Sequence, residues 1–265
     1  MFENIYQHFK KNEVTFIDQM NEHLIEVEES YTPFLTHFLN PRELWILESL
    51  INRYNGLKFR SFGGTINAES QRVVVVPDFM MIEVSDFHLT LLEINYPVKF
   101  ATLSHSEILG TLLSQGIERF KIGDILTDGT RFQVIVDELI AEFLINQVDR
   151  ISSLKVRLEK KDFSELITST DEFVEQGLTV NSLRMDNLIS NVYNISRERS
   201  KALIERGSVK LNFQVTEKIS EEINLLDLIS VRGFGRFKLT NINGLSKKGK
   251  IKIVAAVLIK DRSSK

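Results

Sequence analysis

The amino-acid sequence predicts an α+β protein made of a helical N-terminal region, an α+β middle domain and a smaller, basic C-terminal domain. Three observations support this class. Apolar residues recur at helical spacing over the first fifty-odd residues, two-residue alternation begins near Leu57, and the charge changes sign near residue 184. A chain of 265 residues is long enough for two or three domains, each with its own core.

The N-terminal region, residues 1–56, is expected to be helical. A helix after Asn40 has its own start signals, because Asn40 can cap it, Pro41 suits the first turn and Glu43 can reach back to the cap. Gly56 is expected to stop that helix. Apolar residues spaced by three and four predict the two preceding helices: Phe2, Ile5, Tyr6 and Phe9, then Phe16, Ile17, Met20, Leu24 and Val27.

Residues 57–161 are predicted to form the middle domain. Its strands come first, and a helix capped by Ser104 and ended by Gly116 follows them. A hairpin then turns at Asp128-Gly129, and a last helix and an alternating strand complete the set. This order is that of a ferredoxin-like or RRM-like α+β sandwich. The apolar residues expected to be buried by the last helix are Leu139, Phe143 and Leu144.

A polar, poorly periodic stretch, residues 162–180, is predicted to be a linker to the C-terminal domain, residues 181–265. Charge separates the two sides of this boundary. Residues 184–265 contain 17 lysines and arginines against 8 aspartates and glutamates, a net +9, whereas residues 1–183 carry a net −12. Such asymmetry indicates a basic module for a polyanion on an acidic body, with accidental clustering of solvated charges as the alternative.

Several function classes are not supported by the composition. The chain has no cysteine, which excludes disulfides, thiolate metal sites and a cysteine nucleophile. Its five histidines lack metal-ligand spacing, and no acid/base pair or phosphate-binding glycine loop stands out. No signal peptide or apolar run of membrane-spanning length is present. We therefore expect a cytoplasmic protein without membrane insertion, catalytic activity, metal or cofactor.

Positive charge is concentrated at one predicted helix start. Ser196 is placed to cap a helix of about ten residues that Gly207 ends. Arg197, Arg199 and Lys201 follow the cap, where the helix dipole is already positive and free N–H groups favour a phosphate. An anionic partner would relieve this conflict, whereas the alternative is that the side chains point separately into water.

A basic, strand-forming segment follows this helix. Lys210 alternates with apolar neighbours, and Arg232 and Arg236 flank a Gly-Phe-Gly bend. The final stretch, KKGKIKIVAAVLIK, predicts a basic loop and a strand. Its lysines suit a phosphate-binding surface and a solvated loop equally well.

The segments LRMDNLISN, SRERSKALIERGSVKLN and LLDLISVRGFGRF, in this order and spacing, resemble the S4 domain, an RNA-binding module. Two departures are Phe213 and Leu226, which stand where that pattern commonly has glycine. Asp186 and Asn212 fit structural roles in the pattern better than RNA contact. The RNA-facing residues that the resemblance and the charge pattern nominate are Arg184, Ser196, Arg197, Arg199, Lys201, Lys210, Asn212, Phe213, Arg232 and Arg236.

With its acidic first half and the segment HSEILGTLLSQGIERFKIGDIL, nearly the whole chain resembles the YlmH family of S4-domain proteins. The resemblance implies an RRM-like middle domain, binding of structured ribosomal or transfer RNA on the large ribosomal subunit, a role in ribosome-associated quality control and a link to cell division. We expect a monomer. The alternative is a protein-interaction factor of the division machinery that uses the acidic first 183 residues, with RNA binding incidental.

Overall fold

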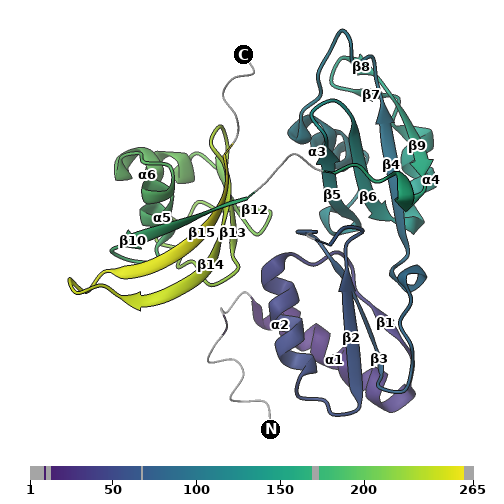
Figure 1. The fold of residues 1–265 in the computed structure, drawn as a ribbon, viewed down its shortest axis with the longest axis horizontal. Coiled ribbons are helices and arrows are strands. Elements are labelled where there is room, and N and C mark those ends of the chain that lie inside the picture. The colour runs from purple at the N-terminus through teal and green to yellow at the C-terminus, as the bar shows by residue number, and fades with distance from the viewer. Residues whose placement is uncertain (1–8, 10–12, 67, 169–172, 260–265) are drawn as a thin grey trace. The chain divides into compact units, whose positions relative to one another are not determined.

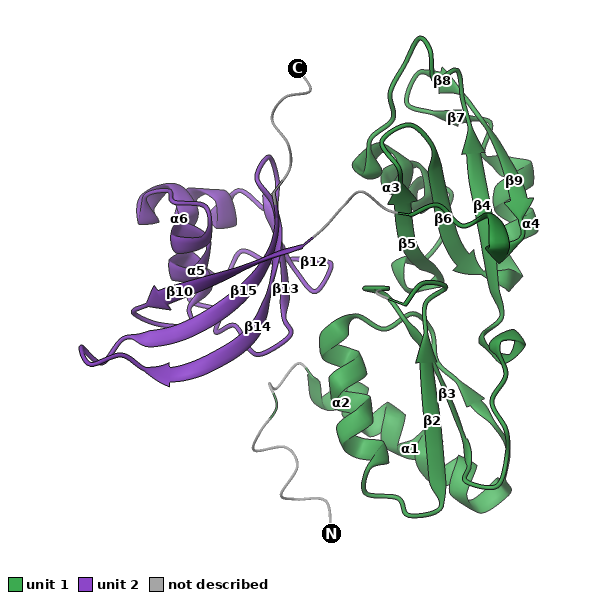
Figure 2. Cartoon of the chain, in the orientation of Figure 1, with its two compact units in different colours: residues 1–170 green, residues 171–265 purple. Residues whose placement is uncertain are grey.

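The computed structural model describes residues 9, 13–66, 68–168 and 173–259. The chain divides into two compact units, residues Met1–Thr170 and Asp171–Lys265 (Figure 2). The described part contains six α-helices and several antiparallel sheets, so it belongs to the mixed α and β class (Figure 1). The predicted helix over residues 2–9 lies almost entirely outside the described residues.

The first part of unit 1 packs two helices against a three-stranded antiparallel sheet in the order β1-β3-β2. The Asn40 side chain accepts hydrogen bonds from the N–H groups of Arg42 and Glu43, and the Glu43 carboxylate accepts the Asn40 N–H, which confirms the predicted capping box of α2. The helix ends at Ile51, earlier than the stop expected at Gly56. The elements are α1 (Val14–Ser30), β1 (Phe34–Leu35), α2 (Pro41–Ile51), β2 (Leu57–Phe62) and β3 (Arg72–Pro77).

The sheet of this part corrects the predicted start of the middle domain at residue 57. Strand β3 pairs with β2 on one side and with β1 on the other, and among the described residues neither β2 nor β3 pairs with a strand of the middle sheet. Every residue of β3 is buried, because Val73 and Val75 face α1 and α2 while Val74 and Val76 pack on Phe87. Periodicity locates a strand in the sequence but does not identify its partners, so this boundary was wrong.

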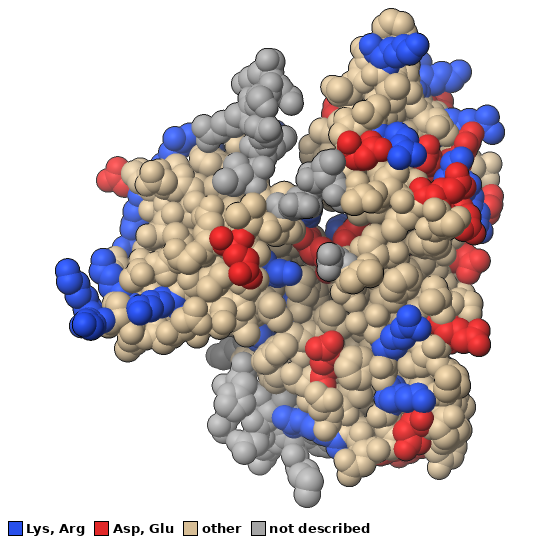
Figure 3. All heavy atoms as spheres, in the orientation of Figure 1, with Lys and Arg blue, Asp and Glu red and all other residues tan. Residues whose placement is uncertain are grey.

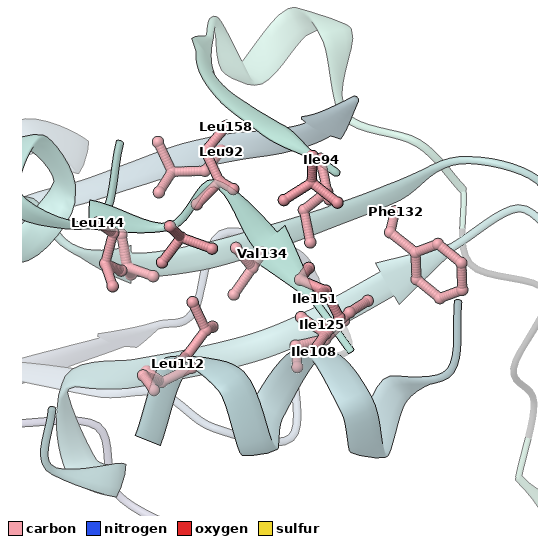
Figure 4. Packing of buried hydrophobic residues seen from close by; sticks show 14 of the residues in the cluster. Leu92, Ile94, Ile108, Leu112, Ile125, Phe132, Val134, Leu144, Ile151 and Leu158 are labelled. Carbon is pink, nitrogen blue, oxygen red and sulfur yellow. The ribbon is translucent and has the colours of Figure 1, made fainter. Parts of the chain in front are cut away.

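The second part of unit 1 has a four-stranded antiparallel sheet in the order β5-β6-β4-β9. Helices α3 and α4 pack on one face of it, around the cluster that Figure 4 shows. The hairpin predicted at Asp128-Gly129 is confirmed, because β5 and β6 pair on either side of it. The elements are η3 (Val84–Phe87), β4 (Leu89–Asn95), α3 (His105–Ser114), η4 (Arg119–Lys121), β5 (Ile122–Thr127), β6 (Phe132–Asp137), α4 (Glu138–Gln147), β7 (Arg150–Ile151), β8 (Leu154–Lys155), β9 (Arg157–Lys161) and η5 (Phe163–Glu165).

The other face of this sheet is also covered. Leu91 and Ile135 on the strands pack with Phe38 and Ile167, which come from segments before and after the sheet. Gln133 is fully buried there, donates to the Glu93 carboxylate and the Glu165 carbonyl, and accepts the Ile167 N–H. Both faces of the four-stranded sheet are therefore occupied by protein side chains.

Helix α4 corrects two predicted core positions. Leu139 is 87% exposed and Phe143 is 44% exposed, whereas Leu144 is buried as expected. The Asp137 carboxylate accepts the Leu139 N–H at 3.0 Å and so fixes where the helix begins. This start turns Ile140, Ala141 and Leu144 toward the sheet and leaves Leu139 and Phe143 on the outer face.

Arg72 joins the two parts of unit 1. It lies on β3 and is almost completely buried. Its guanidinium donates to the Thr36 carbonyl at 2.8 Å and to the Phe87 carbonyl at 3.1 Å, and lies 3.5 Å from the Asp137 carboxylate. A buried cation needs such partners because desolvation is expensive, so these contacts hold the start of β3 against the start of α4.

Unit 2 packs two helices on one face of a six-stranded antiparallel sheet in the order β10-β15-β14-β13-β11-β12. Strand β10 pairs along its whole length with β15. Residues 174–180 are thus an integral strand of unit 2, which corrects their prediction as linker. The elements are β10 (Val174–Val180), α5 (Met185–Val192), α6 (Arg197–Glu205), β11 (Val209–Leu211), β12 (Gln214–Val215), β13 (Leu228–Val231), β14 (Gly235–Leu245) and β15 (Ile251–Ile259).

Candidate nucleic-acid interface

The start of α6 is held firmly against α5. The Ser196 hydroxyl accepts the Arg199 N–H at 3.2 Å, which confirms the predicted cap, and Gly207 follows the helix with a φ of 67°. The buried Ser200 hydroxyl donates to the Asp186 carbonyl at 2.8 Å. These contacts give the basic end of the helix a defined position, because one end is capped and the adjoining turn is anchored to α5.

Asp186 organises two of the predicted arginines. Its carboxylate is fully buried and accepts Nε of Arg184 at 3.1 Å and Nε of Arg197 at 2.9 Å. Burial alone would raise the pKa of Asp186, but the hydrogen bonds and positive charges of Arg184 and Arg197 outweigh it and hold the pKa below its usual value. The side chains of Arg184 and Arg197 remain 40% and 49% exposed. One buried acid therefore presents two half-exposed guanidinium groups.

Arg199 lies over an aromatic ring of the turn between β13 and β14. Its guanidinium carbon is 5.3 Å from the centre of the Phe234 ring, which also packs at 5.3 Å on the ring of Tyr193. Arg232 is exposed in the same turn and is anchored by its N–H, which donates to the Ser208 carbonyl at 2.9 Å. Lys201 is exposed on α6. The tertiary fold thus places the turn carrying Arg232 beside α6.

Lys210 and Arg236 lie on the opposite face of the sheet from the two helices. Their strand neighbours Val209, Leu211 and Phe237 pack in the core with α5 and α6, and alternate residues of a strand point to opposite faces. Arg236 instead has its guanidinium carbon 5.5 Å from the centre of the Phe173 ring. The ten predicted residues therefore do not form a single surface.

Asn212 has a structural role in the turn between β11 and β12. Its side chain donates to the buried Asp227 carboxylate at 2.8 Å and accepts the Leu228 N–H at 2.9 Å. Both turn residues have positive φ, 47° for Asn212 and 69° for Phe213, and Leu226 has a φ of 67°. Phe213 and Leu226 thus occupy, with side chains, the left-handed conformation that glycine adopts most easily.

Two residues that the sequence prediction did not select accompany Arg236. Lys238 is two positions further along β14 and shares its face, and the Lys238 Nζ atom lies 6.0 Å from the centre of the Phe173 ring. Two-residue alternation with Arg236 was the signal that could have identified Lys238. No sequence signal connected Phe173 to either cation, because their contact depends on the pairing of β10, β15 and β14.

The search for other kinds of site concerns the described residues alone. In that part of the chain, no group of three or more histidines, aspartates or glutamates lies close enough together to hold a metal ion. Likewise, no helix within the described ranges is long and apolar enough to cross a membrane.

Comparison with known families gives one match inside unit 1. Residues 83–165 match the family described as "Putative RNA-binding domain in YlmH". This range begins just before η3 and ends with η5, so it contains the four-stranded sheet and excludes β2 and β3. The family boundary thus agrees with the separation of the two sheets.

One relative extends the similarity to both units, and a solved structure is similar to part of the chain. The chain is 38% identical over 251 residues to the ribosome-associated protein quality control protein P2 of Bacillus subtilis, covering 94% of this chain and 97% of that protein. It is similar in structure to the cell division protein ylmH from Streptococcus pneumoniae, with a TM-score of 0.53 and 40% identity over 62% of this chain and 99% of that one. Because the similarity to the first relative spans nearly the full length of both proteins, this chain belongs to the YlmH family of RNA-binding, ribosome-associated proteins.

Proposed function

We propose that this protein is a non-catalytic RNA-binding protein that binds structured ribosomal or transfer RNA on the large ribosomal subunit through one surface of unit 2. The observation that carries the proposal is the capped basic start of α6, with its arginines held in place by Asp186 and Phe234. We call this surface the α6 surface. Its residues are Arg184, Ser196, Arg197, Arg199, Lys201 and Arg232.

The physical chemistry of the α6 surface suits a phosphate. A helix start carries free N–H groups and the positive end of the dipole, and here Arg197 and Arg199 add full charges. Asp186 and Phe234 restrict the two guanidinium groups before any ligand arrives, which lowers the entropy lost on binding. Cations of this kind bind phosphates with steep salt dependence, and RNA shape then provides the specificity.

The helices and strands within each unit support the finer domain assignments. The two-helix, basic unit 2 carries the S4 pattern, and residues 83–165 have the strand and helix order β-α-β-β-α-β that an RRM-like domain has. RRM domains stack bases on aromatic side chains of an open sheet face. Here Phe38 and Ile167 cover that face, so we assign the principal RNA contact to unit 2.

The names of the relatives favour a ribosomal site of action. One is called ribosome-associated and the other a cell division protein. The first name suits a ribosome-bound role in quality control. We propose that the protein performs this role in the cytoplasm and as a monomer. The second name suits the alternative function, an interaction with a division protein through unit 1 that does not depend on the α6 surface.

Co-sedimentation with purified large ribosomal subunits tests the proposal. Arg199→Gln with Lys201→Gln is the appropriate variant, since neither side chain pairs with the buried Asp186. We expect affinity to fall about tenfold and the slope of log affinity against log salt to flatten by about two, one per lost phosphate contact. The matched control is Lys218→Gln, which removes an exposed charge 3.8 Å from Glu221. Equal binding by the double variant and the wild type would contradict the α6 surface.

A further inference from the structure

Strands β14 and β15 form a hairpin that extends past β13, while β10 pairs with β15 as far as Ile251, where the turn of the hairpin begins. Strand β13 pairs with β14 only as far as Lys238, so among the described strands residues 240–245 of β14 pair with β15 alone. Figure 1 shows the turn of this yellow hairpin beyond the end of β10. Register shifts after Leu239 and after Ile242 are bulges, which bend and twist the two strands.

The tip of this hairpin is a structured turn. The Ser246 N–H donates to the Lys250 carbonyl at 2.7 Å, and the Gly249 N–H donates to the Ser246 carbonyl at 2.9 Å. The Ser246 hydroxyl also accepts the Lys250 N–H at 3.0 Å, and Gly249 supplies the positive φ that the turn requires. These hydrogen bonds fix the backbone that carries the lysines of the turn.

Three exposed lysines occupy this turn, and we call Lys247, Lys248 and Lys250 the arm tip. The sequence from residue 228 to residue 260 contains eight lysines and arginines and no aspartate or glutamate. Figure 3 shows the basic side chains gathered at the tip without an acidic neighbour on that face. Repulsion among like charges opposes this arrangement in the free protein, and an anionic partner would relieve it.

Apolar side chains lie beside these lysines. Leu245, immediately before the turn, is 68% exposed, and Ile242 is 40% exposed. Ile251 opposite Leu245 is half-buried. A hairpin turn with exposed lysines, followed by exposed apolar side chains on its strands, can place cations on backbone phosphates while its apolar part contacts sugars or base edges.

We propose that the arm tip is a second RNA-binding element, separate from the α6 surface, that contacts the phosphate backbone of the same structured RNA. The inference rests on the proposed function for the identity of the partner. Lysine supplies a mobile point charge without bidentate geometry, so the arm tip adds affinity and orientation with little sequence preference. Two contacts on one rigid unit also restrict how the RNA can lie across it.

The test compares full-length variants in binding to purified large ribosomal subunits over a series of KCl concentrations. The variant Lys247→Gln, Lys248→Gln, Lys250→Gln removes the charges from exposed positions, and the matched control replaces the same residues with arginine. We expect the glutamine variant to bind at least fivefold more weakly, with a salt slope flatter by about two, and the arginine variant to bind like the wild type. Thermal unfolding monitors the fold of each variant.

The Arg199→Gln, Lys201→Gln protein, measured in parallel, separates this inference from the proposed function. If the triple glutamine variant keeps the affinity and salt slope of the wild type while the Arg199→Gln, Lys201→Gln protein binds more weakly, only the inference about the arm tip is overturned. Wild-type binding in both variants would overturn both surfaces. Absence of binding by the wild type would overturn the proposed function itself and the RNA assignment of the arm tip with it.

Discussion

A single buried carboxylate, Asp186, determines how two surface arginines are presented. Its charge is retained in the folded protein because Arg184 and Arg197 donate hydrogen bonds to it. The hydroxyl of Ser200 on α6 also donates to the backbone carbonyl of Asp186. The sequence pattern predicts a structural aspartate at this place, and its hydrogen bonds agree with that role. The arginines therefore combine a fold-stabilising contact with an exposed positive face.

We expect Asp186→Asn to lower the free energy of unfolding of unit 2 by about 2 kcal/mol at pH 7, since charged hydrogen bonds are lost to partners that are partly screened by solvent. A carboxyl whose pKa is depressed in the folded state stabilises the fold above its unfolded pKa of about 3.9. That stabilisation disappears as the pH falls through the lower folded pKa. Hydrogen exchange of the α5 amides should show the difference between wild type and variant shrinking below about pH 4. An equal difference at pH 7 and pH 3 would contradict this linkage.

Asn212 provides a second residue-level prediction. Asn212→Ala removes one partner from the buried Asp227 carboxylate and one from the Leu228 N–H. We expect unit 2 to lose about 2 kcal/mol in urea unfolding, because buried polar groups are left without their hydrogen bonds. RNA affinity per folded molecule should stay unchanged, and a tenfold loss of affinity with unchanged stability would show that Asn212 contacts RNA instead.

At the scale of elements, α6 has separable structural and binding functions at its first turn. The Ser196 hydroxyl supports the helix by accepting the Arg199 N–H, while Arg197 and Arg199 are exposed and, in our proposal, contact RNA. We expect Ser196→Ala to lower stability by about 1 kcal/mol with little change in RNA affinity. Ser196→Asp retains an acceptor and should keep stability, but its negative charge should weaken RNA binding severalfold. Thermal unfolding and subunit co-sedimentation on both variants check this crossed pattern, and parallel losses in both measurements would refute it.

Strand alternation explains why the predicted site is divided. Lys210 and Arg236 are flanked by Val209, Leu211 and Phe237, which fill the core beneath the helices. Because a strand sends successive side chains to opposite faces, these cations must leave the helical side. Their sequence proximity to the α6 pattern is therefore not proximity in space.

For the whole molecule, charge and fold agree on a division of roles. Residues 184–265 carry a net +9 and residues 1–183 a net −12, and the division of the chain into two compact units falls after residue 170. Each unit has buried clusters made of its own side chains. Electrostatics alone thus favours unit 2 as the RNA-binding unit.

We expect residues 171–265, produced alone, to fold and to bind large ribosomal subunits with a salt slope close to that of the full chain. Residues 1–170 should bind at least tenfold more weakly, since their net charge is negative and both faces of the four-stranded sheet are covered. Sedimentation with the two fragments measures this directly. Stronger binding by residues 1–170 would move the principal contact to the family-matched region, residues 83–165.

Local signals in the sequence were sufficient for much of the fold. The caps at Asn40, Ser104 and Ser196 and the turn at Asp128-Gly129 were predictable because each depends on residues within a few positions of one another. The S4 pattern and the charge asymmetry likewise pointed to an RNA-binding member of the YlmH family, and the comparisons confirm the family.

Only the tertiary structure decided what depends on long-range pairing. The assignment of β2 and β3 to a separate sheet, the place of β10 in unit 2 and the outward direction of Leu139 follow from strand partners and helix phase, which periodicity alone does not specify. The same reason separates Lys210 and Arg236 from the α6 surface and brings the turn carrying Arg232 beside it. The sequence by itself determined which residues carry the charge and how each helix starts, because those are local properties. The fold determined which of the charges share a face, because that depends on segments far apart in the chain.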